Sequence, residues 1–469
     1  MNKKRQTLIY ICWDLFSAGL GWWLFFNFRK HIVEASKHGY DIPINNDIKL
    51  TLGLFILPLF WVGLYTFSGY YHHIFRRSRL REVQNTFNTS VAGVLILFFV
   101  LLLDDSVQSY RDYYFSSGFL FLVHFVPTLL GRLTISTRTI RKIQSRKWGY
   151  KTILVGNGIN ANHLYHELQS AKKSEGFFIL GYVTGSDEQL TVEGLPNIGN
   201  WSDLPRIIGE KQIEDVIICM DDKDHDKVPA VVDLVQNEQV HLKILPDSYG
   251  MVLGMIKMNN ILGAMLVEAD FEVMPQWQKS AKRVFDAVVG ILALIIASPL
   301  FLLLAIWIKI DSKGPIFYKQ QRIGYLGKPF SIYKFRSMRI DAETAGPQLS
   351  KENDQRITRI GRSLRKTRLD EIPQFFNVLI GDMSIVGPRP ERQFFIDQIV
   401  KKAPYYKRLH RIKPGITSWG QVKFGYAENV DQMVDRMKYD ILYLENMSLG
   451  LDIKIMIYTA LIMVQGRGK

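Results

Sequence analysis

Long apolar runs alternate with short charged stretches over the first third of the chain. Each run is close to the ~20 residues that a helix needs to cross a bilayer. The runs occupy residues 7–28, 50–71, 86–103 and 113–135. They contain few charged residues, of which Asp14 is the clearest, so the pattern favours an anchoring bundle over a pore. We therefore expect four transmembrane helices within a first domain, residues 1–145.

The positions of lysine and arginine predict how this bundle is oriented. Basic residues gather before the first run, in the link after the second and in the stretch after the fourth. Because cytoplasmic loops carry an excess of such residues, these three regions are expected in the cytoplasm, together with everything after the fourth helix. The basic start followed by an apolar run also matches a signal peptide, but no small-residue cleavage site is evident, which favours a retained helix.

The pattern then changes to short apolar strands separated by helical stretches, which is typical of a βαβ series. The strand-like runs are residues 151–155, 177–183, 215–220 and 241–245. They predict a second domain with a parallel sheet over residues 146–275. Gly156 and Gly158 follow the first strand, where they would let a dinucleotide phosphate approach the N terminus of the next helix. A glycine turn this short is weak support, so nucleotide binding stays open.

One further apolar segment, residues 287–308, is long enough to cross the membrane. A straight helix of this length extends about 33 Å, against a hydrocarbon core of ~30 Å. Pro299 near its middle removes a backbone donor and kinks the helix, and Ser298 can donate to a freed carbonyl. Lysines and arginines flank both ends, so both flanks are expected in the cytoplasm. We therefore predict a re-entrant membrane helix with a central break over residues 283–309, and a kinked full crossing is the alternative.

The composition agrees with a chain that is part membrane and part globular. Its 469 residues have a mean hydropathy near zero, too apolar for an ordinary soluble enzyme and too charged for a pure transporter. A net charge of +15 suits anionic lipid or anionic substrates, and no nucleic-acid-binding motif accompanies it.

Cys12 lies in an apolar helix and Cys219 in an expected buried strand, which argues against a disulfide framework or a thiolate metal site. The C-terminal stretch 449–465 carries Asp452 and Lys454 among apolar residues and suits an interfacial helix.

Two adjacent carboxylates, Asp370 and Glu371, lie among basic residues in the last third of the chain. A carboxylate that approaches a phosphate meets a repulsion of about 1 kcal/mol at ~4 Å in water and several times more in a partly dry site. Nearby guanidinium groups and a divalent cation offset that repulsion. Arg365 and Arg368 lie close to the pair in sequence, and a stiff Gly-Pro-Arg-Pro turn presents Arg389. The plainer alternatives are a helix cap at Asp370 with Glu371 merely on the surface, and a structural ion pair at Arg389.

The acid pair belongs to a series of segments that resembles the bacterial sugar transferases, the polyprenyl-phosphate hexose-1-phosphate transferases. The resemblance covers roughly residues 279–469, and the segments follow the order found in the family. They are residues 282–286, 314–322, 333–338, 365–377, 381–390 and 413–422. The resemblance implies a membrane protein of mixed class, the long form of the family. It would hold a four-helix transmembrane bundle, a Rossmann-like or CoA-binding-like α/β domain and a mixed α/β catalytic domain with a re-entrant membrane helix.

The resemblance also implies an activity. Asp370 would attack the phosphorus that bears the sugar in a UDP-sugar, UMP would leave, and undecaprenyl phosphate would then accept the sugar phosphate. Glu371 would bind Mg²⁺, which neutralises the diphosphate. The substrate-binding residues implied are Lys334, Arg336, Arg365, Arg368 and Arg389. Physical chemistry alone does not decide which acid is the nucleophile, so that role is carried over by position.

The implied setting is the cytoplasmic face of the bacterial inner membrane, where this step starts exopolysaccharide, capsule or O-antigen synthesis. UDP-glucose is the expected donor, and UDP-galactose is the alternative. The expected partners are the UDP-sugar, undecaprenyl phosphate and the lipid bilayer, without nucleic acid, and a homo-oligomer is left open. A non-catalytic membrane scaffold or regulator of glycan export is the alternative from a different functional class.

Overall fold

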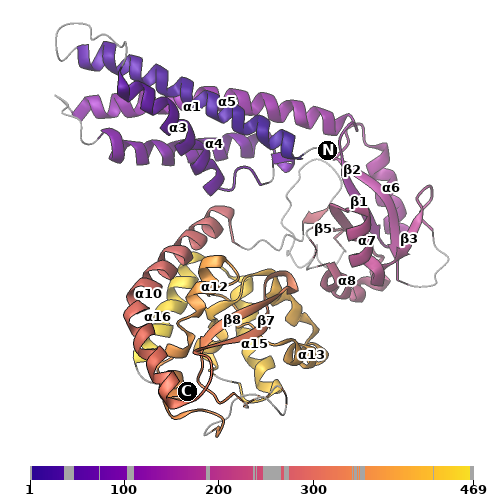
Figure 1. Ribbon diagram of the computed structural model, residues 1–469. Helices are drawn as coiled ribbons and strands as arrows, with labels where there is room; N and C mark the ends of the chain where they lie inside the picture. Colours follow the sequence, from indigo (N-terminus) through magenta and orange to yellow (C-terminus); the bar gives the residue numbers. More distant parts are fainter. Residues whose placement is uncertain are drawn as a thin grey trace. The chain divides into compact units, whose positions relative to one another are not determined.

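The computed structural model describes most of the chain (Figure 1). The described residues are 3–35, 47–72, 74–102, 110–185, 191–235, 238, 240–246, 266–268, 274–340, 342, 346, 348, 354–425 and 427–464. Contacts group the chain into two compact units. The first comprises Met1–Tyr150 with Leu168–Phe178, and the second comprises Lys151–Glu167 with Ile179–Lys469. The long N-terminal helices lie in the first unit, and the acid pair lies in the second.

Four long helices dominate the first unit, and they coincide with the apolar runs of the sequence. They are α1 (Lys3–Phe28), α3 (Ile48–Phe67), α4 (Arg79–Leu97) and α5 (Tyr110–Gln144). The π-helical segments η1 (Arg29–Glu34) and η3 (Phe98–Leu102) continue α1 and α4, and the 3₁₀ turn η2 (Ile74–Arg76) precedes α4. Helix α1 packs on α3 and α5, and α4 packs on α5. Each of the four is long and apolar enough to cross a membrane; residue 103, at the end of the third predicted run, lies outside the described residues.

A buried ion pair joins α1 to α5 inside this bundle. Arg132 donates from Nε and Nη2 to the two carboxylate oxygens of Asp14, at 2.8 and 2.7 Å, and both side chains are fully buried. Tyr71 donates a further hydrogen bond to Asp14, and Arg132 donates another to Thr86. Charges inside a membrane bundle are costly unless they are paired in this way. Asp14 is the clearest charged residue in the apolar runs of the sequence, and the structure supplies its partner.

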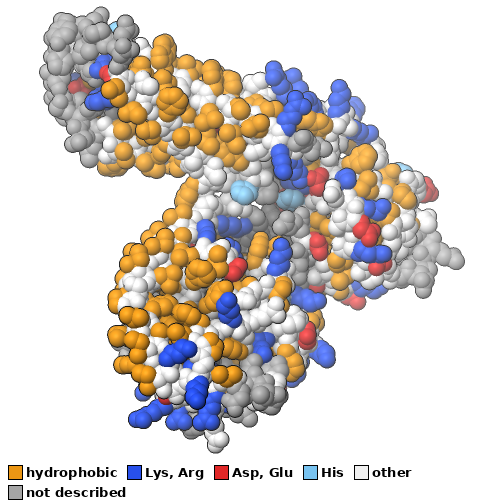
Figure 2. Space-filling model, viewed as in Figure 1, with side chains coloured by type: hydrophobic (Ala, Val, Ile, Leu, Met, Phe, Trp, Pro, Cys, Tyr) orange, Lys and Arg blue, Asp and Glu red, His pale blue; other side chains and the backbone are white. Residues whose placement is uncertain are grey.

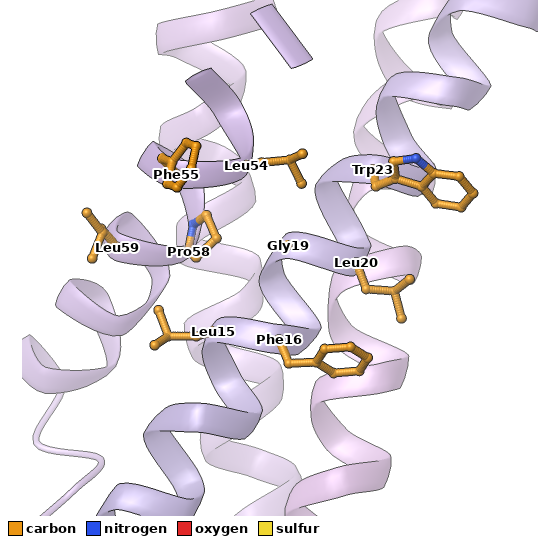
Figure 3. Close-up of a pocket in the computed structure, with 9 residues that line it drawn as sticks. All are labelled: Leu15, Phe16, Gly19, Leu20, Trp23, Leu54, Phe55, Pro58 and Leu59. Atoms are coloured by element: carbon orange, nitrogen blue, oxygen red, sulfur yellow. The ribbon is translucent and has the colours of Figure 1, made fainter. Parts of the chain in front are cut away.

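An apolar cavity of about 610 Å³ opens between α1 and α3 (Figure 3). Its lining residues are Leu15, Phe16, Gly19, Leu20, Trp23, Leu54, Phe55, Pro58 and Leu59. None of these described lining residues carries a charge that would hold a phosphate. The cavity therefore suits hydrocarbon rather than a nucleotide sugar.

A six-stranded sheet with intervening helices follows the bundle in sequence (Figure 1). Its elements are β1 (Tyr150–Val155), α6 (Ile159–Ser170), β2 (Phe177–Thr184), β3 (Asn197–Asn200), η4 (Trp201–Asp203), α7 (Leu204–Lys211), β4 (Asp215–Ile218), η5 (Asp222–Lys227), α8 (Val228–Val235), β5 (His241–Ile244) and β6 (Val267–Glu268).

The strand order of this sheet is β3-β2-β1-β4-β5-β6. Parallel pairing joins β2 to β3, β1 to β4 and β4 to β5, whereas β6 pairs antiparallel with β5. Ile153 of β1 and Val216 of β4 are fully buried, as expected where helices cover both faces of a sheet. The predicted βαβ series and parallel sheet are confirmed.

The C-terminal region is a mixed arrangement of helices around two small sheets. Its elements are α10 (Gln276–Asp311), β7 (Phe317–Ile323), η6 (Tyr325–Gly327), β8 (Pro329–Phe335), α11 (Arg359–Lys366), η7 (Leu369–Glu371), α12 (Gln374–Ile380), β9 (Ser384–Val386), α13 (Gln393–Lys402), η8 (Pro404–Arg411), β10 (Gly415–Thr417), α14 (Trp419–Lys423), α15 (Val430–Glu445) and α16 (Leu449–Val464). Strands β7 and β8 form an antiparallel hairpin, and β9 and β10 form a parallel pair.

Helix α10 runs through Pro299 without interruption, so the structure has a bend within one helix where the sequence predicted a break. Pro299 lies inside α10, and Figure 1 shows the helix changing direction along its length. Ser298 Oγ donates to the carbonyl of Ile295 at 2.8 Å. That carbonyl is four residues before Pro299, so it is the acceptor that a proline at position 299 leaves without its usual donor. The expected hydrogen bond from Ser298 to a freed carbonyl is therefore present.

Apolar side chains cover the outward surface of α10. Ile295 and Ile296, at the bend, are 62% and 76% exposed, and Figure 2 shows hydrophobic side chains gathered over this helix. Helix α10 is the fifth described helix that is long and apolar enough to cross a membrane. An exposed apolar stripe of this length fits contact with lipid hydrocarbon.

Candidate active site

The acid pair lies on a short helical turn between two helices. Asp370 and Glu371 end the turn η7, which follows α11 and leads into α12. Arg368 just before the turn has a φ of +56°, in the left-handed region, so the chain changes direction sharply there. The turn directs both carboxylates inward, and they are only 7% and 8% exposed. The plainer alternative of an exposed surface acid is thereby excluded for Glu371.

Positive charges from several elements converge on Glu371. Lys334, near the end of β8, places its Nζ 2.8 Å from Oε1 of Glu371. Arg368 and Arg389 add their charges to the same carboxylate. Burial by itself would raise the pKa of Glu371, but these cations, led by Lys334, outweigh burial and hold the pKa well below its usual range. Glu371 is therefore an ionised carboxylate at neutral pH.

At Asp370 the effect of burial on the pKa outweighs that of the nearby cations. Burial raises the pKa of its carboxyl above the usual range, and the neighbouring negative charge of Glu371 raises it further. Lys334 and Arg365 oppose this shift without cancelling it. Two adjacent acids with pKa values pushed apart are typical of sites in which the acids have different chemical roles. A poorly solvated carboxylate among cations is suited to attack a phosphorus atom.

Asn377 fixes the acid pair against the strand that carries Lys334. Its Oδ1 accepts a hydrogen bond from the backbone of Tyr333 at 3.1 Å, and its Nδ2 donates to the carbonyl of Ser331 at 2.8 Å. The side chain is fully buried. Because both bonds join α12 to β8, they set the distance between the turn at residue 371 and Lys334.

The motif at residues 282–286 anchors α10 to the same region. Arg283 donates to the carbonyls of Val378 and Leu379, which belong to the C-terminal end of α12. Asp286 accepts a hydrogen bond from the backbone of Ile385 in β9. Lys282 donates to the carbonyl of Val386 and to the buried Asp452 of α16. These contacts connect the apolar helix to the element that follows the acid pair.

Buried acids that the sequence did not single out fix the backbone of the turn that presents Arg389. Asp440 of α15 accepts a backbone hydrogen bond from Gly420 at 2.9 Å and another from Arg389 itself. Glu391, two residues after Arg389, pairs with Arg322 at 3.3 Å and with Arg436. The turn that presents Arg389 is thus fixed from both sides.

A signal for one of these acids was present in the sequence. Asp440 falls at helical spacing with Met433, Met437 and Leu444, which are buried residues of α15. An acid in the middle of an apolar helix face needs a partner, and that pattern would have indicated a buried contact.

The structure brings most of the predicted basic residues to the acid pair, but it gives Arg336 a different environment. Arg336 Nη2 donates to the carbonyls of Ile308 and Ser312 and to the hydroxyl of Ser312. These groups lie at the C-terminal end of α10, where a buried cation satisfies carbonyls that the helix leaves without donors. These contacts give Arg336 a structural role at the end of the apolar helix, and substrate binding by Arg336 stays a prediction. Arg365, in contrast, stays beside the pair and donates to Ser337 Oγ at 3.0 Å.

Comparisons with known proteins point to the same region of the chain. The bacterial sugar transferase family matches residues 277–466, and a CoA-binding domain family matches residues 66–246. A Salmonella typhimurium protein described as an undecaprenyl-phosphate galactose phosphotransferase is 30% identical over 430 residues, which cover 87% of this chain and 85% of that protein. The chain belongs to the bacterial sugar transferase family.

Other relatives of this bacterial sugar transferase match over shorter stretches. An Aeromonas hydrophila UDP-N-acetylgalactosamine-undecaprenyl-phosphate N-acetylgalactosaminephosphotransferase is 43% identical over 187 residues, 40% of this chain and 44% of that protein. A Xanthomonas campestris UDP-glucose:undecaprenyl-phosphate glucose-1-phosphate transferase is 34% identical over 296 residues, 61% of this chain and 60% of that protein. The chain thus spans about half of the length of these two relatives. The buried acid pair lies inside the part that matches the family.

Proposed function

We propose that this chain transfers a hexose 1-phosphate from a UDP-sugar to undecaprenyl phosphate. The observation that carries the proposal is the buried Asp370–Glu371 pair, with Lys334, Arg365 and the two arginines at 368 and 389 contributing charge around it. Such a group can hold a diphosphate and also supply a nucleophile. Relatives whose names describe this transfer for glucose, galactose and N-acetylgalactosamine support the reaction class.

The reaction proceeds in two displacements at phosphorus. A carboxylate oxygen of Asp370 bonds to the phosphorus that bears the sugar, the bond from that phosphorus to the bridging oxygen breaks, and UMP leaves. An oxygen of undecaprenyl phosphate then bonds to the same phosphorus, and the bond to Asp370 breaks, which restores the free carboxylate. Burial raises the pKa of Asp370, so its carboxylate is a stronger base than a solvated aspartate. Lys334, Arg368 and Arg389 stabilise the charge on the transferring group.

Mg²⁺ is part of the proposal, held by Glu371. Among the residues that the structure describes, no group of three or more His, Cys, Asp or Glu side chains is placed to hold a metal ion. Mg²⁺ commonly takes only one or two carboxylates and completes its shell with substrate phosphates and water, so an ionised Glu371 fits this donor set. When bound, the ion would neutralise charge on the diphosphate. Lys334 lowers the pKa of Glu371 and so keeps this metal-binding carboxylate ionised.

In this proposal the reaction takes place at a membrane surface, and the apolar helices support that setting. The four helices of the first unit cross the membrane, and α10 enters one leaflet and returns at its Pro299 bend. The bend, its exposed apolar side chains and the cationic flanks of α10 support this arrangement over a straight crossing. The acid pair then lies on the cytoplasmic side of a bacterial inner membrane, where both a soluble nucleotide sugar and a lipid phosphate are accessible.

The proposed donor is UDP-glucose, with UDP-galactose as the alternative, and the experiment is a donor panel. Membranes that carry the protein receive undecaprenyl phosphate and one of UDP-glucose, UDP-galactose or UDP-N-acetylgalactosamine. We expect UMP release and a labelled sugar phosphate in the lipid extract with at least one donor, stopped by a chelator and restored by Mg²⁺. No release with any donor would contradict the transferase and favour the non-catalytic scaffold of glycan export.

A further inference from the structure

The glycine turn after β1 lies at the position where sheets of this order bind nucleotides. Strand β1 stands between β2 and β4, the point at which the strand order reverses. In such sheets a diphosphate usually rests on the N terminus of the helix that follows the first strand, here α6. The family match over residues 66–246 names a CoA-binding domain, and CoA carries a diphosphate. The residues at this turn decide whether such a group fits.

A carboxylate of the chain itself already occupies the start of α6. Asp221, which follows β4, accepts the backbone N–H of Ile159 at 3.2 Å through Oδ2 and that of Asn160 at 3.0 Å through Oδ1. The side chain of Asn160 donates in turn to the carbonyl of Met220. Residues 159 and 160 are the first two of α6, and their N–H groups are the donors that a phosphate would use.

Both glycines of the turn are explained by contacts within the chain. A Cβ at Gly158 would lie 1.9 Å from Oδ2 of Asp221, so only glycine lets the carboxylate come this close. Gly156 has a φ of +133°, and a Cβ there would lie 2.6 Å from the carbonyl oxygen of Cys219. The glycines therefore allow the turn to pack on the end of β4. No phosphate is needed to account for them.

The space left at the turn is also too small for a nucleotide. The cavity bounded by Gly156, Gly158, Trp201 and Asp221 has a volume of about 20 Å³. That volume is close to what one water molecule needs. A diphosphate would have to displace the carboxylate from its two N–H donors, or lie against its negative charge.

We infer that Asp221 closes this turn to nucleotide phosphates, so that the α/β domain takes neither CoA nor a dinucleotide there. The residues do not fit the group that the family description implies. Asp221 acts instead as the cap of α6, joining the helix start to the end of β4. The inference is independent of the transfer reaction, because it concerns only the α/β domain.

Two measurements on the full-length protein in lipid nanodiscs test this inference. Titration of the wild-type protein with CoA and with NAD⁺ should give no saturable heat at concentrations up to about 1 mM. Saturable binding of either nucleotide would overturn it. The titrations are run in an excess of UDP, so that the diphosphates of CoA and NAD⁺ do not bind at the acid pair, and UMP release can succeed or fail independently.

Hydrogen exchange tests the cap with a matched pair of variants. Asp221→Ala removes the carboxylate that caps α6, whereas Asp224→Ala removes a carboxylate that lines the same cavity and pairs with Lys227. We expect the amides of residues 159 and 160 to exchange about tenfold faster in Asp221→Ala than in Asp224→Ala, because replacing a capping carboxylate by alanine destabilises the first helical turn by about that factor. Equal exchange in the two variants would overturn the role of Asp221.

Discussion

Lys334 Nζ lies 2.8 Å from Glu371 Oε1, and this contact gives two adjacent acids different properties. Burial opposes the ionisation of both carboxyls. At Glu371 the surrounding cations, led by Lys334, outweigh burial and lower the pKa, whereas at Asp370 burial prevails and raises it. One acid is therefore a stable anion suited to a metal ion, and the other is the more basic carboxylate suited to attack.

Lys334→Gln is expected to lower kcat/KM for sugar-phosphate transfer by about 10- to 100-fold. The variant leaves Glu371 buried without its ion pair and removes a cation from the diphosphate, and a charge-assisted hydrogen bond contributes about 1.5–3 kcal/mol. The control is Lys328→Gln, which removes an exposed lysine from the same hairpin. Equal activities of the two variants would show that Lys334 has no part in the reaction.

Asp370→Asn should stabilise the protein at neutral pH. Folding raises the pKa of Asp370. The protonated carboxyl therefore stabilises the fold fully below the pKa of the unfolded chain, near 3.9, and this stabilisation is lost as pH rises through the folded-state pKa. The variant avoids the buried charge, so we expect its thermal midpoint at pH 7.5 to exceed that of the wild type by about 1–3 °C, a gain that disappears toward pH ~4.

Glu371→Gln is the matched comparison for this stability measurement. The pKa of Glu371 is lowered in the folded state, so its ionised form stabilises the fold above the unfolded value near 4.3. The thermal midpoint of this variant should therefore fall at pH 7.5. Shifts of the same sign in the two variants would contradict the assignment of different roles to the two acids.

Much of the fold could be predicted because its signals are local. Apolar runs of bilayer length gave the helices, and short apolar runs between helical stretches gave the parallel sheet. The sequence also singled out the acid pair, because it stands in a series of segments that resembles one family, and its catalytic role stays a prediction. Ser298 was predicted to satisfy a carbonyl freed by Pro299, because that contact lies within one helical turn.

The remaining features depend on contacts between distant segments. Lys334 and Arg336 are two residues apart, but β8 ends at Phe335, and the chain then turns Arg336 toward the end of α10. Arg132 lies inside the fourth apolar run, where the surrounding apolar residues dominate the pattern. Its partner Asp14 is 118 residues away. Such pairings are determined by tertiary packing, which no local pattern records.

The bend at Pro299 predicts that both ends of α10 face the cytoplasm. In a Cys12→Ser, Cys219→Ser background, Lys279→Cys introduces a cysteine in the first turn of α10, and Lys313→Cys introduces one just after its end. Each should react with a membrane-impermeant maleimide only after spheroplasts are permeabilised. Reaction of either cysteine in intact spheroplasts would instead indicate the kinked full crossing.

Arg132→Met is expected to destabilise the helix bundle by about 3–5 kcal/mol, because it leaves Asp14 buried without its partner. The double variant Asp14→Leu, Arg132→Met removes both charges and should recover most of that loss. Unfolding in a mixed-detergent series measures both values. A double variant no more stable than the single one would show that the pair is not the cause.

The most direct test is UMP release by membranes that carry either the wild-type protein or Asp370→Asn, with the preferred UDP-sugar, Mg²⁺ and undecaprenyl phosphate. The buried pair predicts release by the wild type and a loss of at least about 10³-fold in the variant, because the nucleophile is gone while the fold is retained. Thermal midpoints measured on the same samples verify the fold. Release at the wild-type rate by Asp370→Asn would contradict the assignment of this carboxylate as the nucleophile.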